Sequence, residues 1–397
     1  MANSKDPFRP GSICNQVLNL IYELGELPYS ALRVLGSSTK SNQNTIKKME
    51  EKGYFRIEKL YKGKTIKLGR RNNELSEYIF PGALEVYNSA VHNTYHVPET
   101  RKVNFSNITK QTRRDRNIRV GKSAAFFQGA GIYVYSDGSK NKPNLRKSFL
   151  TGNEIAYYLS SDIKNFMSDE EKRISARSLG CIVYFHDMYM VYFLDVTVPK
   201  TSQDVERKFR IHMEVAVNRG NHGKYALSIN KCVLVLEQYG LLERIFHNDE
   251  NDDSGKYKYQ RMLFSIDDTY DEFFCLPYNR KGQEICKMLF HDRNRLKYLP
   301  IKKSEREFET TTVDCDGIDE DGNFILSFLD CEARKLKRFI EMANYFASNG
   351  SDCIFRIICF DFQVETIKKL CTENCEIYSY TVEQVVHAYG WSEGREE

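Results

Sequence analysis

Apolar residues between positions 12 and 71 follow a pattern that predicts a helix, a turn, a second helix and a β-hairpin. They recur at spacings of three and four over Ile13–Leu24, which is the period of an amphipathic helix, and Gly25 stands where this helix is expected to end. A polar turn at residues 36–38 separates it and the following apolar segment from the second helix. This order of elements is typical of a winged helix-turn-helix.

The second helix of this pattern has a polar outward face. It is expected to begin near residue 39, with Ile46 and Met49 pointing inward. Lysine can bind phosphate or guanine, and the amides of Asn and Gln can pair with adenine edges. The expected outward residues are Lys40, Asn42, Gln43, Asn44, Lys47 and Lys48. They predict a helix that reads the major groove of DNA, and a solvated helix in a protein-binding domain is the alternative.

Two strand-like runs, residues 54–61 and 65–68, are expected to pair across a turn at Lys62 and Gly63. Basic residues on this hairpin would hold DNA phosphates without reading the bases. The hairpin and its end carry Lys59, Lys62, Lys64, Lys67, Arg70 and Arg71. A later basic helix with Arg113, Arg114 and Arg116 either extends this surface or forms a solvated face.

The remainder of the chain predicts mixed α and β structure. A helix is expected over residues 150–166, and a hairpin over residues 181–185 and 188–196. After residue 322, strands and helices alternate, which predicts a small, partly parallel sheet covered by helices. The fold class is therefore mixed α+β, with a winged helix followed by α/β domains. The expected parts are a DNA-binding domain at 1–95, a mixed α/β middle domain at 110–300 and a small α/β unit at 301–397.

Charge is distributed unevenly along the chain. Residues 1–125 hold 22 Lys and Arg against 11 Asp and Glu, whereas the remaining residues hold 36 against 43. A basic N-terminal part on an acidic body is typical of a nucleic-acid-binding module joined to a separate functional domain. A generic solvated surface is the other interpretation that charge alone allows.

The cysteines and the apolar content indicate in which cellular compartment the protein is expected. The 11 cysteines have irregular spacings and no Cys-x-x-Cys pair, which predicts free thiols in a reducing compartment rather than metal ligands. No run of about 18 apolar residues occurs, and the first residues lack the apolar core of a signal peptide. We therefore expect a cytoplasmic protein without a membrane partner.

The candidate catalytic residues are Asp330, Glu332 and Asp361. The first two end one predicted strand of the C-terminal unit, and Asp361 ends the next. Carboxylates at the ends of neighbouring parallel strands can hold a divalent metal, as in a metal-dependent nuclease. The Glu-x-Lys that such sites carry on a strand is missing, and acidic residues also end strands because they cap the next helix. No phosphate-binding glycine loop, HExxH or GxSxG motif is present, so no cofactor is expected.

Three stretches resemble the replication-relaxation family of plasmids and integrative mobile elements. They are residues 44–55 with the hairpin that follows, residues 116–135 and residues 324–346. The last stretch is similar to a strand of that family that ends in an acidic residue and precedes a helix with Lys. The resemblance implies a winged-helix N-terminal half and an α/β half related to the restriction-endonuclease-like fold.

These patterns together predict a protein that binds double-stranded DNA. It would act in replication, relaxation or transcription control of a plasmid, phage or integrative element. A metal-dependent nuclease and a protein-binding structural or adaptor protein are the alternatives, and a homodimer is left open. The expected DNA-binding residues are Lys40, Asn42, Gln43, Lys47, Lys48, Lys62, Lys64, Lys67, Arg70, Arg113, Arg114 and Arg116.

Overall fold

Contacts within the computed structural model group the chain into two compact units. Unit 1 comprises Met1–Phe193 and Ile211–Ser228, and unit 2 comprises Leu194–Arg210 and Ile229–Glu397. The structure describes residues 6–9, 11–36, 38–60, 63–75, 111–135, 155–160, 177–184, 187–195, 203–220, 229–246, 270–306 and 313–390.

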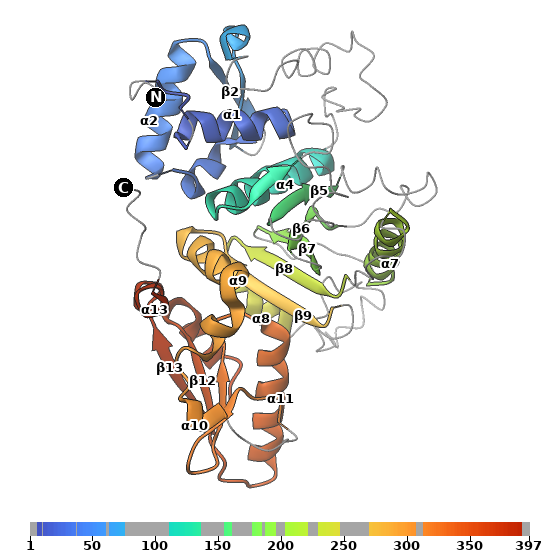
Figure 1. Cartoon of the computed structure of the whole chain (residues 1–397), viewed down its shortest axis with the longest axis vertical. Coiled ribbons are helices and arrows are strands. Elements are labelled where there is room, and N and C mark those ends of the chain that lie inside the picture. Colours follow the sequence, from blue (N-terminus) through green and yellow to red (C-terminus); the bar gives the residue numbers. More distant parts are fainter. Residues whose placement is uncertain are drawn as a thin grey trace. The chain divides into compact units, whose positions relative to one another are not determined.

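Unit 1 begins with helices in the order that the apolar pattern predicts (Figure 1). The hydroxyl of Ser12 caps the first helix by accepting a hydrogen bond from the N–H of Asn15 at 3.2 Å, and Gly25 ends this helix with a φ of 82°. Ser38 caps the later helix in the same way. The elements are α1 (Ile13–Leu24), the strand β1 (Leu27–Pro28), the 3-10 helix η1 (Tyr29–Val34) and α2 (Thr39–Glu51).

A three-stranded antiparallel sheet of order β1-β3-β2 accompanies these helices. β2 (Phe55–Leu60) pairs with β3 (Gly63–Leu68) along their whole length, so the predicted hairpin is confirmed. The base of the hairpin is tight, because a Cβ on Gly69 would lie 2.2 Å from the carbonyl oxygen of Gly53. The 3-10 helix η2 (Asn72–Leu75) follows.

The helix α4 (Gln111–Gly129) packs against β1 and η1 within unit 1. A Cβ on Gly121 would lie 2.3 Å from Cδ of Pro28, so the absence of a side chain permits this close approach. Farther along, the side chain of Gln128 donates a hydrogen bond to the carbonyl oxygen of Gln16 at 3.2 Å. α4 is thereby fixed to the N-terminal elements.

The strands that follow α4 in unit 1 are largely buried. β4 runs parallel to β5, whereas β5, β6 and β7 are antiparallel neighbours, and the β6–β7 pair confirms the predicted hairpin. The helix predicted over residues 150–166 is wrong at residues 156–159, which form a strand with all four side chains buried. The strands are β4 (Tyr133–Tyr135), β5 (Ala156–Leu159), β6 (Gly180–Tyr184) and β7 (Asp187–Leu194). The helix α7 (Gln203–Gly220) follows them and contributes residues to both units.

Unit 2 contains a parallel pair of strands, β8 and β9, followed by a long helix. The side chain of Asn279 caps this helix by accepting a hydrogen bond from the N–H of Gly282 at 2.9 Å. The helix kinks at Asp292, whose φ and ψ of −156° and 91° are not helical. The elements are β8 (Lys231–Leu236), α8 (Leu241–Phe246), β9 (Glu272–Pro277), α9 (Arg280–Tyr298) and α10 (Lys303–Arg306).

A four-stranded sheet of order β10-β11-β12-β13 forms the C-terminal part of unit 2. β11, β12 and β13 are parallel and β10 is antiparallel, so the predicted partly parallel sheet is confirmed. The rings of Phe339 and Phe355 meet with centroids 5.1 Å apart, which joins the helix after β11 to the sheet. The elements are β10 (Gly317–Ile318), β11 (Phe324–Ser327), α11 (Ala333–Ser348), β12 (Phe355–Phe360), η5 (Asp361–Gln363), α12 (Val364–Lys368), β13 (Cys375–Tyr380) and α13 (Val382–Tyr389).

The described residues thus form mixed α and β structure with partly parallel sheets, as the sequence predicted. Among the helices in these residues, none combines the length and the apolar character that crossing a membrane requires.

Candidate functional site

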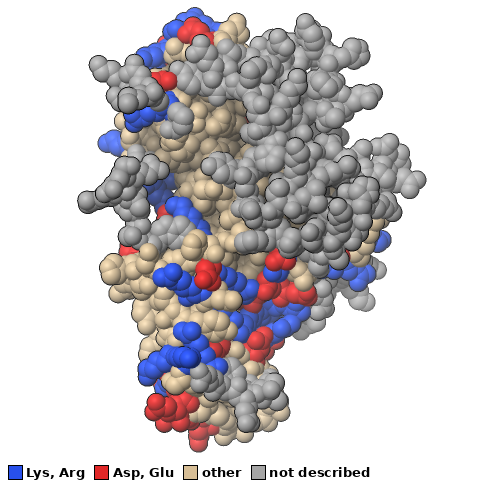
Figure 2. Space-filling view, in the orientation of Figure 1, with Lys and Arg blue, Asp and Glu red and all other residues tan. Residues whose placement is uncertain are grey.

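α2 presents a basic face to solvent in unit 1. Lys40, Lys47 and Lys48 are exposed, and none of their ammonium groups forms a hydrogen bond or ion pair with another described residue. Asn44 is also exposed, whereas Gln43 is half-buried. Figure 2 shows Lys and Arg side chains over the part of unit 1 that contains α2. Within the described residues, nothing competes with an anionic ligand for these three ammonium groups.

The prediction that Asn42 lies on this outward face is wrong. Asn42 is 2% exposed, and its Nδ2 donates hydrogen bonds to the carbonyl oxygens of Leu32, at 3.0 Å, and Leu35. These carbonyls belong to the last turn of η1 and to the residue after it. Asn42 therefore holds the connection between η1 and α2 and is not available to a base.

The predicted phosphate-binding residues differ in their surroundings. Lys64 and Arg70 are exposed on the hairpin and at its end, and Arg114 is half-buried on α4. Lys62 and the side chain of Arg113 lie outside the described residues. Together with Lys59, which is also exposed, Lys64 and Arg70 therefore remain the described hairpin candidates for phosphate contacts.

Two other predicted residues are engaged inside the protein. Lys67 forms an ion pair with Glu58 at 2.9 Å across the hairpin. Arg116 donates hydrogen bonds from Nη2 to the hydroxyl of Ser160 at 3.0 Å and to the carbonyl oxygen of Ser178 at 2.8 Å. Binding DNA through either side chain would exchange these contacts for contacts with phosphate, so both are weaker candidates than Lys64.

In unit 2, Asp330 lies shortly after β11 and is 2% exposed. Its Oδ2 accepts a hydrogen bond from Nε of Arg293 at 2.8 Å, and its Oδ1 accepts one from the N–H of Glu332 at 3.1 Å. Arg293 also donates from Nη1 to Glu272 of β9 at 2.6 Å. Burial opposes the charge of Arg293, but the two carboxylates outweigh burial and raise its pKa. A guanidinium, rather than an open coordination site, therefore faces Asp330.

Glu332 caps α11. Its Oε1 accepts hydrogen bonds from the N–H groups of Phe273 and Arg334, each at 3.1 Å, and its Oε2 accepts one from the N–H of Lys335 at 2.7 Å. The helix-capping alternative is confirmed for this residue. Burial, and next the charge of Asp330, raise the pKa of Glu332 to about 7 despite these donors.

Asp361 is separate from these two carboxylates. It is exposed and pairs with Lys281 of α9 at 3.2 Å, whereas Asp330 and Glu332 have other partners. In the described part of the chain, no group of three or more His, Cys, Asp or Glu side chains is arranged to hold a metal ion. The predicted trio of carboxylates is therefore not brought together as a metal site.

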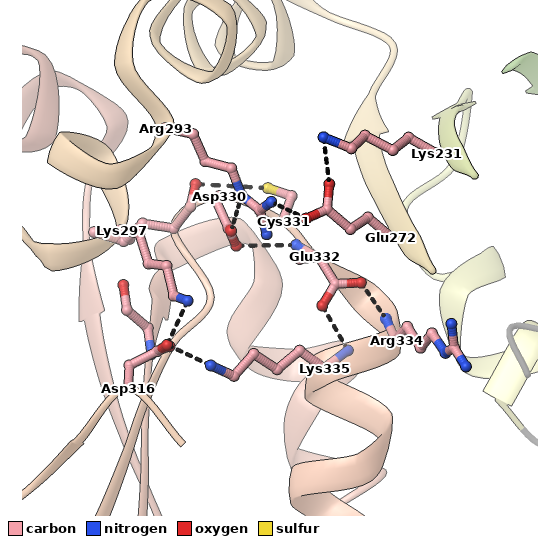
Figure 3. A network of polar contacts seen from close by, with 12 residues as sticks. Lys231, Glu272, Arg293, Lys297, Asp316, Asp330, Cys331, Glu332, Arg334 and Lys335 are labelled. Atoms are coloured by element: carbon pink, nitrogen blue, oxygen red, sulfur yellow. Dashed lines mark hydrogen bonds and ion pairs between the residues drawn. The ribbon is translucent and has the colours of Figure 1, made fainter. Parts of the chain in front are cut away.

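The buried carboxylates belong to a network that includes residues the sequence analysis missed (Figure 3). Asp316 has no exposed side-chain surface and contacts Nζ of Lys297 at 2.6 Å and Nζ of Lys335. Its Oδ2 also accepts a hydrogen bond from the N–H of Ser327 at 3.0 Å. Because each carboxylate meets a cation or a backbone donor, the network is charge-compensated by the protein itself.

A strained turn places Asp330 and Glu332 in this network. Cys331 between them has a φ of 59°, and it is the one non-glycine residue of the described segments with a positive φ. Its N–H donates to the carbonyl oxygen of Phe328 at 3.1 Å, and its own carbonyl oxygen accepts from the N–H of Cys275 at 2.9 Å. The turn thereby ties the end of β11 to β9, which offsets the strain of about 1–3 kcal/mol that such a conformation stores.

The sequence carried only a partial signal for the network. Arg293 and Lys297 are four residues apart and so share one side of a helix, which is a detectable spacing. Asp316 stands in a short polar segment with no distinguishing pattern. The bond from Arg293 to Asp330 joins residues 37 positions apart, and local periodicity does not encode such pairs.

Glu332 gives a pH-dependent contribution to stability that its replacement should remove. Because its folded pKa is raised from 4.5 to about 7, this contribution is fully present below pH 4.5 and is lost as the pH rises through 7. Between about pH 4.5 and about pH 8, the unfolding free energy of the protein relative to Glu332→Gln should fall by about 3 kcal/mol. Urea denaturation followed by circular dichroism at several pH values measures this difference.

The matched control for Glu332→Gln is Glu365→Gln, at an exposed carboxyl in the first turn of α12. It supplies the baseline for a change from Glu to Gln at a surface position over the same pH range. A Glu332→Gln difference that does not vary with pH beyond this baseline would contradict a raised pKa at Glu332.

No protein-family model, no curated protein and no solved structure matches this chain.

Proposed function

We propose that the protein binds double-stranded DNA through a winged helix formed by residues 12–71. The element order supports this proposal, since α1, η1 and α2 precede the β2–β3 hairpin and β1 completes the sheet. In that arrangement α2 enters the major groove and the hairpin contacts the flanking backbone. The observation that carries the proposal is the exposed row of Lys40, Lys47 and Lys48 on α2, which has no partner among the described residues.

The roles of the side chains follow from their chemistry. Lys40, Lys47 and Lys48 bind phosphates or guanine, and the amides of Gln43 and Asn44 pair with base edges. Lys64 and Arg70 hold the backbone and set the register without reading sequence. The resemblance of residues 44–55, 116–135 and 324–346 to the replication-relaxation family supports a role in replication, relaxation or transcription control of a mobile element.

The nuclease alternative has less support from the contacts. A metal-dependent nuclease needs carboxylates that converge on an open position. Asp330 instead binds Arg293, Glu332 caps α11, and Asp361 pairs with Lys281. A protein-binding role for α2 is the remaining alternative, and dependence on salt separates it from DNA binding.

The test is a salt titration of binding to a duplex by the full chain and by a variant with Lys40, Lys47 and Lys48 replaced by Ala. Each phosphate contact contributes about 0.9 to the slope of log affinity against log salt. The variant should therefore lose roughly 2 to 3 from that slope and bind on the order of a hundredfold more weakly near 0.1 M salt. Fluorescence anisotropy of a labelled duplex gives both quantities.

The control variant changes the same charge elsewhere. Lys302, Lys368 and Lys369 are exposed lysines of unit 2, and their replacement by Ala should leave the slope close to that of the wild type. Equal slopes for both variants would place the interface away from α2. Absence of any salt-dependent binding to duplex DNA would reject the proposed function in favour of a protein partner.

A further inference from the structure

A partly open pocket of about 360 Å³ lies in unit 1 where five of its elements meet. This volume is near the lower end for small-molecule sites and suits a ligand of about one nucleotide. The lining comes from the segment around β1, from η1, α2, β3 and α4. Residues that matter for its chemistry are Glu26, Pro28, Tyr29, Gln43, Lys64 and Asn117.

The cavity adjoins the proposed DNA-reading face. Gln43, which lines it, stands three residues after Lys40 and four before Lys47, so these side chains share one side of α2. Lys64 comes from the turn end of the hairpin, and the Cα of neighbouring Gly63 has no side chain to narrow the space. A ligand in the cavity would therefore lie beside any DNA strand that is bound by α2 and the β2–β3 hairpin.

The apolar part of the lining is suited to a flat ring. Pro28 and the ring of Tyr29 supply apolar surface, and Tyr29 offers an aromatic face for stacking. Burial, and next the charge of Glu50, raise the pKa of Tyr29, so its hydroxyl stays a donor at neutral pH. The Nζ of Lys64 lies over this ring, 5.7 Å from its centroid, so a base that stacks there would displace the ammonium group, which would then be free to bind the phosphate of the same nucleotide.

The polar part of the lining offers both donors and acceptors. Gln43 and Asn117 carry carboxamides that form no hydrogen bond with another described residue. Glu26 accepts only a long hydrogen bond from Thr65, at 3.4 Å, and lies 3.7 Å from Lys67, so its oxygens retain accepting capacity. Two amides and one carboxylate around a flat apolar surface match the edge of a nucleobase, and the carboxylate favours bases with an amino group.

Other ligand classes fit less well. A small carboxylic acid would face the charge of Glu26, and a metal ion would find one carboxylate rather than the several that hard cations take. A wholly apolar effector would bury the two carboxamides and the carboxylate without partners.

We propose that this cavity binds one nucleobase with its phosphate, stacked on Tyr29 and read by Gln43, Asn117 and Glu26, with Lys64 on the phosphate. The base comes either from an unpaired nucleotide of a bound DNA strand or from a free nucleotide. The first source rests on the proposed DNA binding, and the second is independent of it. The substrate class that follows is DNA with an unpaired base, or a free purine or cytosine nucleotide, in preference to thymidine.

The test uses the full chain with four probes. They are a fully paired duplex, the same duplex with one unpaired 2-aminopurine, and the free nucleotides deoxyguanosine monophosphate and thymidine monophosphate. The wild type should bind the duplex with the unpaired base about tenfold more tightly than the paired one, because base stacking on an aromatic residue contributes about this much. The fluorescence of 2-aminopurine should change on binding, and deoxyguanosine monophosphate should reverse the change at lower concentration than thymidine monophosphate.

Two variants of the cavity and one control complete the test. Asn117→Leu removes one reading group at similar size, and Ser30→Trp places a ring in the cavity from its exposed edge. Both should lose the preference for the unpaired base and the effect of deoxyguanosine monophosphate, while keeping the wild-type affinity for paired duplex. Asn73→Leu changes an exposed amide outside the cavity and should behave as the wild type.

The outcomes separate this inference from the proposed function. Equal affinity for both duplexes, together with no binding of either free nucleotide, overturns the inference and leaves duplex binding standing. Binding of deoxyguanosine monophosphate that both cavity variants abolish, without a preference for the unpaired base, supports the inference with the free nucleotide as the source. The same nucleotide binding in the absence of any duplex binding supports the inference and rejects the proposed function.

Discussion

Replacement of Arg293 by Met should lower the unfolding free energy by about 3–5 kcal/mol, because it leaves Asp330 buried without its counter-charge. Asp330 is 2% exposed, and Nε of Arg293 is its cationic partner at 2.8 Å. Met retains an apolar stem over the ring of Phe274, which the guanidinium carbon approaches to 4.7 Å from the centroid. The measured loss of unfolding free energy is therefore due mainly to the missing positive charge and not to lost apolar packing. Urea denaturation of the full chain at neutral pH measures it.

A matched pair on the same helix provides the control. Lys281 also lies on α9 and also binds a carboxylate at a strand end, that of Asp361 at 3.2 Å, but both side chains are substantially exposed. Lys281→Met should change stability by less than about 1 kcal/mol. The double variant Arg293→Met with Asp330→Asn should recover much of the loss, since it removes the orphaned charge. A similar loss for both single variants would show that burial does not distinguish the two pairs.

Replacement of Asn42 by Asp should destabilise the N-terminal elements by about 3 kcal/mol or more, since it buries a charge against two carbonyl oxygens. Asn42 is 2% exposed and donates to the carbonyl oxygens of Leu32 and Leu35, and an ionised Asp cannot donate to either. Asn42→Leu should be milder, at about 2 kcal/mol, because it loses the bonds without adding a charge. Hydrogen exchange of peptides that cover residues 29–51 locates the effect, and denaturation gives its size.

The control for this position lies two residues along the same helix. Asn44 is exposed, so Asn44→Asp should change stability by about 0.5 kcal/mol or less. If Asn42→Asp were as stable as Asn44→Asp and altered the base preference of DNA binding, then Asn42 would face the DNA. That result would reinstate the sequence-based placement of this residue.

Local patterns predicted much of the fold. The helix over residues 13–24, the hairpin over residues 55–68 and the alternating strands and helices after residue 322 all follow from apolar periodicity and turn residues. Asn42 shows a signal that could have been used, since it precedes Ile46 by four residues and Met49 by seven, and so lies on the inward stripe of α2. Because Asn is polar, the sequence analysis placed it on the outward face instead.

Two features could not be obtained from local patterns. Residues 156–159 are Ala-Tyr-Tyr-Leu, a short apolar run that periodicity alone cannot distinguish from part of a helix. Their burial on both faces depends on neighbouring strands. The carboxylates of unit 2 were found as strand-end residues, but whether they meet a metal or a cation depends on α9, which approaches from a separate part of the sequence. Tertiary pairing therefore decided the chemistry at that site.

The charge network of unit 2 limits which parts of this chain could be transferred to another protein by recombination. A segment that started at Ile301 would carry Asp316, Asp330 and Glu332. It would lack Arg293 and Lys297, and the N–H of Phe273 that Glu332 accepts from. Asp330 would then enter a new host without its cationic partner, Asp316 would keep Lys335 but lose Lys297, and Glu332 would lose one of its three backbone donors. We therefore expect the C-terminal sheet to be stable in another protein only when it is transferred together with β9 and α9.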